Sequence, residues 1–402
     1  MPRGRFVLPA LLLLSSSFVR TAAADSFLGD GIVVTDVGDV QDHLHAIAVA
    51  GDALYLAGMD SVPHVGRWRV EKRRLSDGAL VPEFGDAGVL AIDPTADWDR
   101  ITAIAVDGRH LFLVGEAAAT LRIEKRVAYD GRLRTTFGSG GVLAMPNETV
   151  AWQSANTALV VEDHLYVATG TGRVLKLRTR DGGAVARFKP ADTPPAASTR
   201  VNALAASNRA LYIGAATDQG FRFEKRGLQA GRLFWTVDES FSRVGCGIEA
   251  PQALVVANGT LVAGGMHGGR WHLERRRERD GALLWTVDLP GTGDCDVVND
   301  VVVVGDELFA VGSRGSRRRI EKRRLADGAL VSGFGVGGAL VAGRRLFEAS
   351  SAAITCGDLI VGGTSYGEGD RLTKESWVTA RVAARDGLPV VASVPPCGGT
   401  AR

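Results

Sequence analysis

The sequence lacks the patterns that mark most catalytic and metal sites. It has no HExxH motif, no phosphate-binding glycine loop, no chain order typical of a Ser-His-Asp triad and no CxxC pair. Its net charge is only +2, so bulk charge gives no reason to expect nucleic acid as a partner. No stretch after residue 24 is long and apolar enough to span a bilayer. We therefore expect no cofactor, no metal ion, no nucleic acid and no membrane span.

The one extended apolar run lies at the start of the chain, where residues 1–24 predict a cleavable signal peptide. Arg3 and Arg5 form a basic start, Phe6–Val19 an apolar core and Ala22–Ala24 a small-residue cleavage site. A membrane anchor is the alternative, but the run is short and is interrupted by a proline and three serines. This pattern predicts a secreted or periplasmic protein whose mature chain begins near Asp25.

Cysteine is scarce, with four residues in 402, and export would allow these four to form disulfides. Four cysteines permit three pairings. Two of them precede the innermost strands of successive repeats, which favours pairing these two with each other and the other two with each other. A zinc site is the competing interpretation, but no neighbouring histidine pattern supports it. In chain order, the two expected disulfides are Cys246 with Cys295 and Cys356 with Cys397.

What the sequence does have is a repeat. The stretch Arg122–Leu143 consists of an apolar strand pattern, an Asp-Gly turn and a glycine-rich step into a further strand. Near-copies occupy Arg69–Leu90 and Arg319–Leu340, and weaker ones Phe223–Asp238 and Leu273–Asp288. The turn recurs about every 50 residues, which is typical of β-propeller blades. Its seven copies are Asp77-Gly78, Asp130-Gly131, Asp181-Gly182, Ala230-Gly231, Asp280-Gly281, Asp327-Gly328 and Asp386-Gly387.

A second segment of each repeat predicts a hairpin of two short strands. Apolar runs interrupted by Gly, Asn or Asp are hairpin signals. Two hairpin strands and the two around the repeated stretch make a four-stranded antiparallel unit, and seven such units predict an all-β, seven-bladed β-propeller. The hairpins are Ala46–Gly58, Ala103–Gly115, Ala158–Gly170, Ala203–Ala215, Ala253–Gly265, Val301–Gly312 and Ala352–Gly363.

The start of the mature chain indicates how the ring closes. Phe27–Val34 matches the glycine-to-strand step of Phe84–Leu90, yet no blade precedes it. We expect it to pair with the last blade, so that residues 25–402 form a single domain. Two smaller arrays are the alternative, and no Pro- or Ser-rich linker supports them.

These motifs resemble the bacterial delta-sixty propeller repeat. Phe84–Gly138 carries every element of that repeat, and the likeness continues more weakly over nearly the whole mature chain. Leu233–Trp235 and Leu283–Trp285 are closer to the related quinoprotein-type (PQQ-like) repeat. The resemblance implies an exported propeller of unassigned function, and neither repeat carries catalytic residues by itself.

Recurring charges on the third strand of each unit predict structural ion pairs. Glu71 and Arg73 are two residues apart, so they share a face of the strand. The same pair recurs in four other units, whereas the third unit has Leu175 and Leu177 and the seventh has Ala380 and Val382. Joint loss of both charges is expected for a buried pair, because a single survivor would be uncompensated.

The cation between the paired residues persists in all seven units. We expect its stem to cover apolar surface and its charged head to reach water. A ring of cations that binds a polyanion is the alternative. The seven residues are Lys72, Lys125, Lys176, Lys225, Arg275, Lys322 and Arg381.

One polar residue stands just before each predicted innermost strand, and these seven are the candidate binding site at the mouth of a central channel. They offer hydrogen bonds but few titratable groups, which suits ligand binding better than acid–base chemistry. The alternative is that they merely hydrate the channel mouth. The candidates are His45, Thr102, Thr157, Asn202, Gln252, Asn299 and Ser351.

Loops leading to that mouth add aromatic and charged residues suited to binding a glycan or peptide. These are His43, Trp98, Asp99, Arg100, Trp152, Arg200, Glu249, Asp294, Asp296 and Glu348. His267 and His272 are five apart, which is not a metal-ligand spacing, and we expect them to be solvated or packed.

We therefore expect a monomeric binding or scaffold module for a protein or glycan. The alternative is a hydrolase, a lyase or a quinone-dependent oxidoreductase with its site in the channel and His45 as the acid–base group. The adjacent cysteine pair that many quinone enzymes carry is missing here.

Overall fold

A computed structural model describes most of the chain after residue 26. The described residues are 27, 31–35, 41–62, 65–146, 148, 157–188, 200–218, 220–240, 249–292, 295–315, 317–341, 346–355, 357–366 and 375–390. The expected signal peptide lies outside them. Within these ranges no helix is long and apolar enough to cross a membrane.

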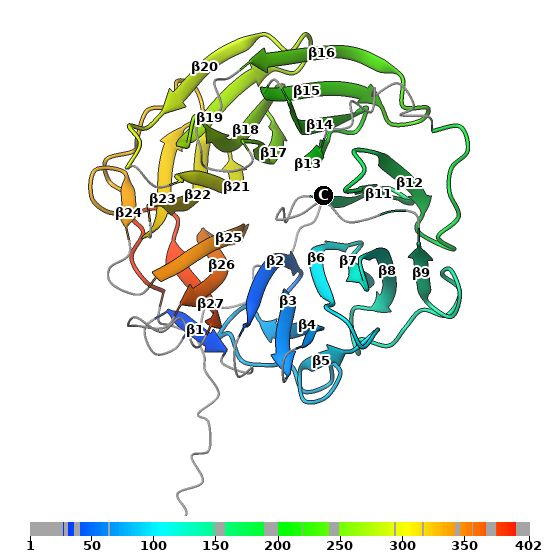
Figure 1. The fold of residues 1–402 in the computed structure, drawn as a ribbon. Coiled ribbons are helices and arrows are strands. Elements are labelled where there is room, and N and C mark those ends of the chain that lie inside the picture. Colours follow the sequence, from blue (N-terminus) through cyan, green and yellow to red (C-terminus); the bar gives the residue numbers. More distant parts are fainter. Residues whose placement is uncertain are drawn as a thin grey trace, which may run out of the picture.

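The strands form seven antiparallel sheets arranged as blades around a central axis (Figure 1), which confirms the predicted seven-bladed β-propeller. Blade 1 holds β2 (His43–Ala50), β3 (Ala53–Val62), β4 (Val65–Arg74) and β5 (Val89–Ile92). Blade 2 holds β6 (Arg100–Val106), β7 (His110–Ala117), β8 (Thr120–Val127) and β9 (Val142–Met145). Blade 3 shows three strands in the part that the structure describes, β10 (Ala158–Val161), β11 (His164–Ala168) and β12 (Val174–Arg178).

The second half of the ring repeats this plan. Blade 4 holds β13 (Arg200–Ala206), β14 (Ala210–Thr217), β15 (Gly220–Gly227) and β16 (Leu233–Ser240). Blade 5 holds β17 (Pro251–Ala257), β18 (Thr260–His267), β19 (Arg270–Arg277) and β20 (Leu283–Asp288). Blade 6 holds β21 (Val297–Val304), β22 (Glu307–Arg314), β23 (Arg317–Arg324) and β24 (Ala339–Val341). Blade 7 holds β25 (Leu346–Thr355), β26 (Asp358–Tyr366), β27 (Glu375–Ala383) and β1 (Ile32–Thr35).

Ring closure is as predicted. β1 pairs antiparallel with β27, with Ile32 opposite Ala380 and Thr35 opposite Trp377. The first strand of the chain is therefore the outermost strand of the last blade, and it lies beside β27 in Figure 1.

The outer strands are of two kinds, which the sequence pattern did not separate. In blades 4 and 5 the outer strand starts right after the Asp-Gly or Ala-Gly turn. In blades 1, 2 and 6 the residues after the turn contribute a single β-bridge, such as Arg73 with Leu80. The outer strand of these three blades begins only after the glycine-rich step, at Val89 in blade 1. The predicted strand after the turn is therefore wrong in these blades. The third strand divides its hydrogen bonds between the residues after the turn and those after the glycine-rich step. In blade 1, Lys72 N–H donates to the Gly88 carbonyl, and the Lys72 carbonyl accepts from Val81 N–H.

The repeated turn depends on its glycine. All seven turn glycines have φ between +72° and +78°, a left-handed conformation that costs residues with a side chain free energy. Six of them, all except Gly231, also lie against the neighbouring blade; a Cβ at Gly131, for example, would lie 2.8 Å from Leu90. The turn is thus fixed by backbone geometry and by the interface at once.

The hydrophobic core is divided into layers between successive blades. One layer joins Tyr55, Trp68 and Phe84 of blade 1 to Ile101 and Leu113 of blade 2. Another closes the ring by joining blade 7 to blade 1. Because each face of a blade is covered by a neighbour, no blade is self-sufficient.

A cation from each of six blades crosses into the next blade and holds its backbone. Lys72 Nζ donates to the Ala128 carbonyl at 2.9 Å and lies over the rings of Tyr55 and Phe84. Equivalent bonds of 2.7 to 3.1 Å run from Lys125 to Thr179, Lys176 to Leu228, Lys225 to Glu278, Arg275 to Leu325 and Arg381 to Leu75. In blade 6 the equivalent Lys322 pairs with Glu307 and lies over Phe309.

These contacts correct the expectation that the charged heads reach water. Lys72, Lys125 and Lys176 are buried, and burial lowers the pKa of each ammonium group. Buried cations that already donate to carbonyls are poorly placed to bind a polyanion, so these three positions are structural.

Arg381 offers the sharpest test, because it joins blade 7 to blade 1. It donates to the carbonyls of Leu75 and Ser76 and pairs with the buried carboxylate of Asp358. Replacement by methionine leaves that carboxylate unpaired, so Arg381→Met should lower the free energy of unfolding by about 3–5 kcal/mol. Thermal and urea unfolding would measure the loss.

The matched control is Arg385→Met. Arg385 is exposed and pairs with Asp386 at the surface, so its loss should leave the free energy of unfolding nearly unchanged. Equal melting temperatures for the two variants would contradict the proposed role of Arg381.

Candidate functional site

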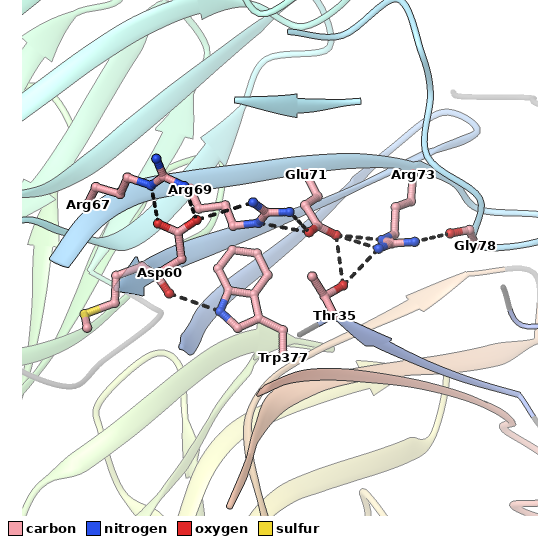
Figure 2. Close-up of polar contacts among 9 residues, drawn as sticks. Thr35, Asp60, Arg67, Arg69, Glu71, Arg73, Gly78 and Trp377 are labelled. Carbon is pink, nitrogen blue, oxygen red and sulfur yellow. Dashed lines mark hydrogen bonds and ion pairs between the residues drawn. The ribbon is translucent and has the colours of Figure 1, made fainter. Parts of the chain in front are cut away.

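The repeated glutamate and arginine residues form buried ladders (Figure 2). In blade 1 the Glu71 carboxylate lies between Arg69 and Arg73, with a nitrogen–oxygen distance of 2.7 Å to each. Arg73 also donates to the Gly78 carbonyl of its own turn and to the Thr35 hydroxyl of β1. The ladder therefore ties the third strand both to its turn and to the preceding blade.

The buried pair of the glutamate with the arginine after it recurs in four other blades and confirms the structural interpretation. The arginine after the glutamate always donates to the turn glycine five residues on, in the pairs Arg126–Gly131, Arg226–Gly231, Arg276–Gly281 and Arg323–Gly328. The third and seventh blades place apolar side chains at both positions instead. A buried carboxylate without its arginine would be unstable, which explains why both charges change together.

A double-mutant cycle in blade 2 tests this coupling. Glu124→Leu alone leaves Arg126 buried without its carboxylate and should cost about 3–5 kcal/mol of stability. Adding Arg126→Leu recreates the apolar pair of blade 3, so the double variant should be more stable than Glu124→Leu. Urea unfolding of the four proteins measures the coupling, and additive losses would refute it.

The seven candidate polar residues lie at one level of the innermost strands, where most of these strands contain a β-bulge. Pairing with the second strand skips one residue in six blades. The skipped residue is His45, Thr102, Asn202, Gln252 or Asn299 in five of these blades, and Thr157 stands directly before β10. In blade 7 the skipped residue is Ser350, so Ser351 is one position further along than its counterparts. A bulge re-aims the side chain that it carries, and none of these bulges was foreseen.

Several of these side chains link neighbouring innermost strands. Asn299 Nδ2 donates to the Ala349 carbonyl of blade 7 at 2.9 Å. The Ser351 hydroxyl accepts from Ile47 N–H of blade 1 and donates to Asp300 of blade 6. Thr102 bonds within its own blade, to the Val114 carbonyl. Thr102, Thr157, Asn202 and Ser351 are buried, so much of this level is engaged in holding the ring together.

His45 is the titratable member of the set, and its surroundings keep it neutral. Its ring stacks on His43, which pairs with Glu375 at 3.0 Å. Burial, followed by the nearby His43 and Arg100, lowers the pKa of His45 to about 3. An acid–base catalyst works best with a pKa near the operating pH, so His45 is poorly suited to that role at neutral pH.

The lowered pKa makes His45 a source of acid sensitivity. Below about pH 6.5 the imidazole of His45 is protonated in the unfolded chain, whereas in the folded protein it stays neutral down to about pH 3. The free energy of unfolding should therefore decrease as the pH is lowered through this range. His45→Asn removes the titrating imidazole, so the stability of this variant should decrease less as the pH is lowered. Melting temperatures from about pH 8 to about pH 4 measure it, with the difference at pH 8 giving the pH-independent cost of the substitution. Parallel curves for the two proteins would contradict the assignment.

The acidic loop residues Asp99 and Asp296 accept hydrogen bonds that hold neighbouring loops together. Asp99 is buried and accepts hydrogen bonds from Thr95 and from Ala118 N–H in the turn between β7 and β8. Asp296 does the same in blade 6, with Thr292 and Gly315 N–H. Burial raises the pKa of Asp99. Of the other loop candidates, Trp152, Asp294 and the side chain of Glu348 lie outside the described residues.

Most of the cysteines of the two expected disulfides lie outside the described residues. Cys246, Cys356 and Cys397 are not among the described residues, and Cys295 is exposed. The pairing of the four cysteines therefore stays a prediction.

Blade 5 contains a cluster that the sequence analysis dismissed. His267, His272 and Asp288 each present a ligand-type atom, and these atoms lie within 4.8 Å of one another. Although burial opposes the charged form, hydrogen bonds to Asp288 and Glu274 raise the pKa of His272 to about 9. The signal that could have found the cluster is the Gly268-Gly269 turn, which folds β18 back on β19.

Several exposed apolar side chains lie at the end of the blades opposite the seven candidate polar residues. Successive turns of an antiparallel sheet alternate between its two ends, so the turns between strands 1 and 2 and between strands 3 and 4 share one end, here called the turn face. Exposed apolar residues of this face are Tyr129, Leu233, Phe234, Leu283, Leu284, Val304 and Leu388.

Comparison with known proteins supports the fold and gives no family. No protein-family model matches the chain, and no curated protein matches it. The crystal structure of BamB from Moraxella catarrhalis is similar over 87% of this chain and 100% of that chain, with 14% identity and a TM-score of 0.50. The computationally designed Ika8 protein is similar over 85% of this chain and 99% of that chain, with 10% identity and a TM-score of 0.46. At 14% identity the likeness to BamB concerns the fold alone, a β-propeller.

Proposed function

We propose that this chain is an exported β-propeller that acts as a binding scaffold for a protein partner. The observation that carries the proposal is the apolar surface on the turn face of blades 4 and 5. Phe234 is 54% exposed, and Leu283 and Leu284 are 48% and 42% exposed. Single exposed apolar residues are ordinary, but neighbouring ones commonly mark an interaction site.

The two blades bring these residues together. The turn of blade 5 packs on the outer strand of blade 4, because a Cβ at Gly281 would lie 3.0 Å from the Trp235 ring. Leu283 and Leu284 follow that turn directly. Phe234 precedes Trp235 in β16, so the apolar residues of both outer strands belong to adjoining parts of the surface.

The outer strands themselves favour a protein over a glycan. β16 has eight residues and β20 has six, against three or four in the outer strands of blades 1, 2, 6 and 7. Within the described ranges no strand pairs with the outer edge of β16 or β20. A free edge beside apolar side chains suits the addition of an extended peptide strand.

The test compares matched exposed positions. The mature chain would be used to enrich and cross-link partners from the envelope and secreted fractions of the cells that produce it, and the affinity of the leading partner would then be measured. Leu283→Ser with Leu284→Ser should weaken that affinity at least tenfold, as expected for losing apolar anchors. The control is Val341→Ser, at an equally exposed residue (49%) at the far end of the outer strand β24.

Melting temperatures should be unchanged in both variants, since none of the three side chains is buried. Equal affinity in all three proteins would overturn the proposed surface. Saturable binding to a glycan panel, with no enriched protein, would overturn the choice of partner.

A further inference from the structure

Blade 5 carries histidines at two strand positions that meet in space. His272 stands where Arg69, Arg122, Arg222 and Arg319 stand in other blades, opposite the same position of the second strand. His267 occupies the place of Asp60, which in blade 1 pairs with Arg67 and Arg69 (Figure 2). Two members of an ion-pair network are thus replaced by imidazoles, which are common metal ligands.

The strand register brings a carboxylate to these imidazoles. His272 is directly opposite Asp288 on β20, and opposite Gly265 on β18. His267 lies two residues beyond Gly265, so it shares a face with His272 as a diagonal cross-strand neighbour. Three adjacent strands therefore supply one side chain each.

The distances are close to those of a metal site. Asp288 Oδ1 lies 2.8 Å from His272 Nδ1 and 3.4 Å from His267 Nδ1. A tetrahedral ion with ligands at about 2.1 Å holds its ligand atoms roughly 3.4 Å apart. The two imidazole rings lie edge to face with centroids 5.1 Å apart. His267 adjoins the Gly268-Gly269 turn, where small adjustments of the strand end are easy.

The surroundings suit a cation that enters from solvent. The side chains of His267 and Asp288 are 33% and 35% exposed, whereas His272 is buried. His272 Nε2 faces Glu274 at 3.7 Å, the arrangement in which an outer carboxylate orients a ligating histidine. Arg276 pairs with both Glu274 and Glu239, so Asp288 is the carboxylate left to the two imidazoles.

We propose that His267, His272 and Asp288 bind one transition-metal dication of the zinc class at the interface of blades 4 and 5, with Glu274 as a positioning residue. Three protein ligands leave one position of a tetrahedral ion open to water or to a partner group. The site lies at the end of the blades opposite the turn face and does not depend on the protein-binding proposal.

The experiment uses the untagged mature chain, stripped of metal with a chelator and titrated with Zn²⁺ and with Co²⁺. We expect saturable binding of one ion per chain, a Co²⁺ visible absorption band and a higher melting temperature with metal. His267→Gln and Asp288→Asn should each weaken binding at least tenfold. The control is His110→Gln, which removes an imidazole paired with a single carboxylate, Asp107, and should leave binding unchanged.

A further variant keeps the test valid if ligand removal disturbs folding. His272→Arg restores the residue of the other blades, and Arg222 already pairs with Asp238 in the equivalent geometry of blade 4. This protein should fold normally and lose metal binding. The proposal is overturned if the wild-type chain shows no saturable binding at millimolar metal, or if His272→Arg binds as the wild type does.

Discussion

The structure depends on the contact between each blade and the next. A four-stranded sheet with two apolar faces cannot be stable in water alone, so every blade must be covered on both sides. Burial of the apolar layers stabilises this contact, but apolar burial alone does not fix the orientation of one blade relative to the next. Direction comes from the crossing cations, which donate to backbone carbonyls of the next blade. Each such bond fixes the height at which one blade sits against its neighbour.

The buried charges work as sets rather than singly. In blades 1, 2 and 6 the third-strand glutamate is held by arginines on either side of it, and the second arginine also closes the turn of its own blade. Loss of one charged residue leaves its partners buried without compensation, whereas exchange of the whole set for apolar residues is tolerated. The third and seventh blades show the apolar solution. Blade 5 shows a third solution, in which His272 replaces the first arginine while Glu274 and Arg276 remain paired.

Features set by local sequence could be predicted, and features set by partners in space could not. The repeat period, the Asp-Gly turns and the unmatched Phe27–Val34 stretch gave seven blades and the correct closure. The crossing cations were misjudged because their carbonyl partners lie about 50 residues away in the next repeat. The bulges at the innermost strands went unseen, since which residue is skipped is defined by pairing with the second strand and not by the innermost strand alone. His267 and His272 were dismissed on their spacing along the chain, although a hairpin makes such residues diagonal neighbours.

Ring closure by β1 has a consequence for how the protein must fold. The strand that is synthesised first completes the blade that is synthesised last, so β1 has no strand partner until β27 has formed. The entropic cost of joining such distant segments rises only slowly with their separation, so closure remains favourable once both strands exist. Until β1 has paired with it, β27 presents an open edge that accepts any strand of matching register. The β1 strand of a second copy fits that edge as well as its own does, and two half-closed rings that exchange β1 would form a dimer with no new contacts.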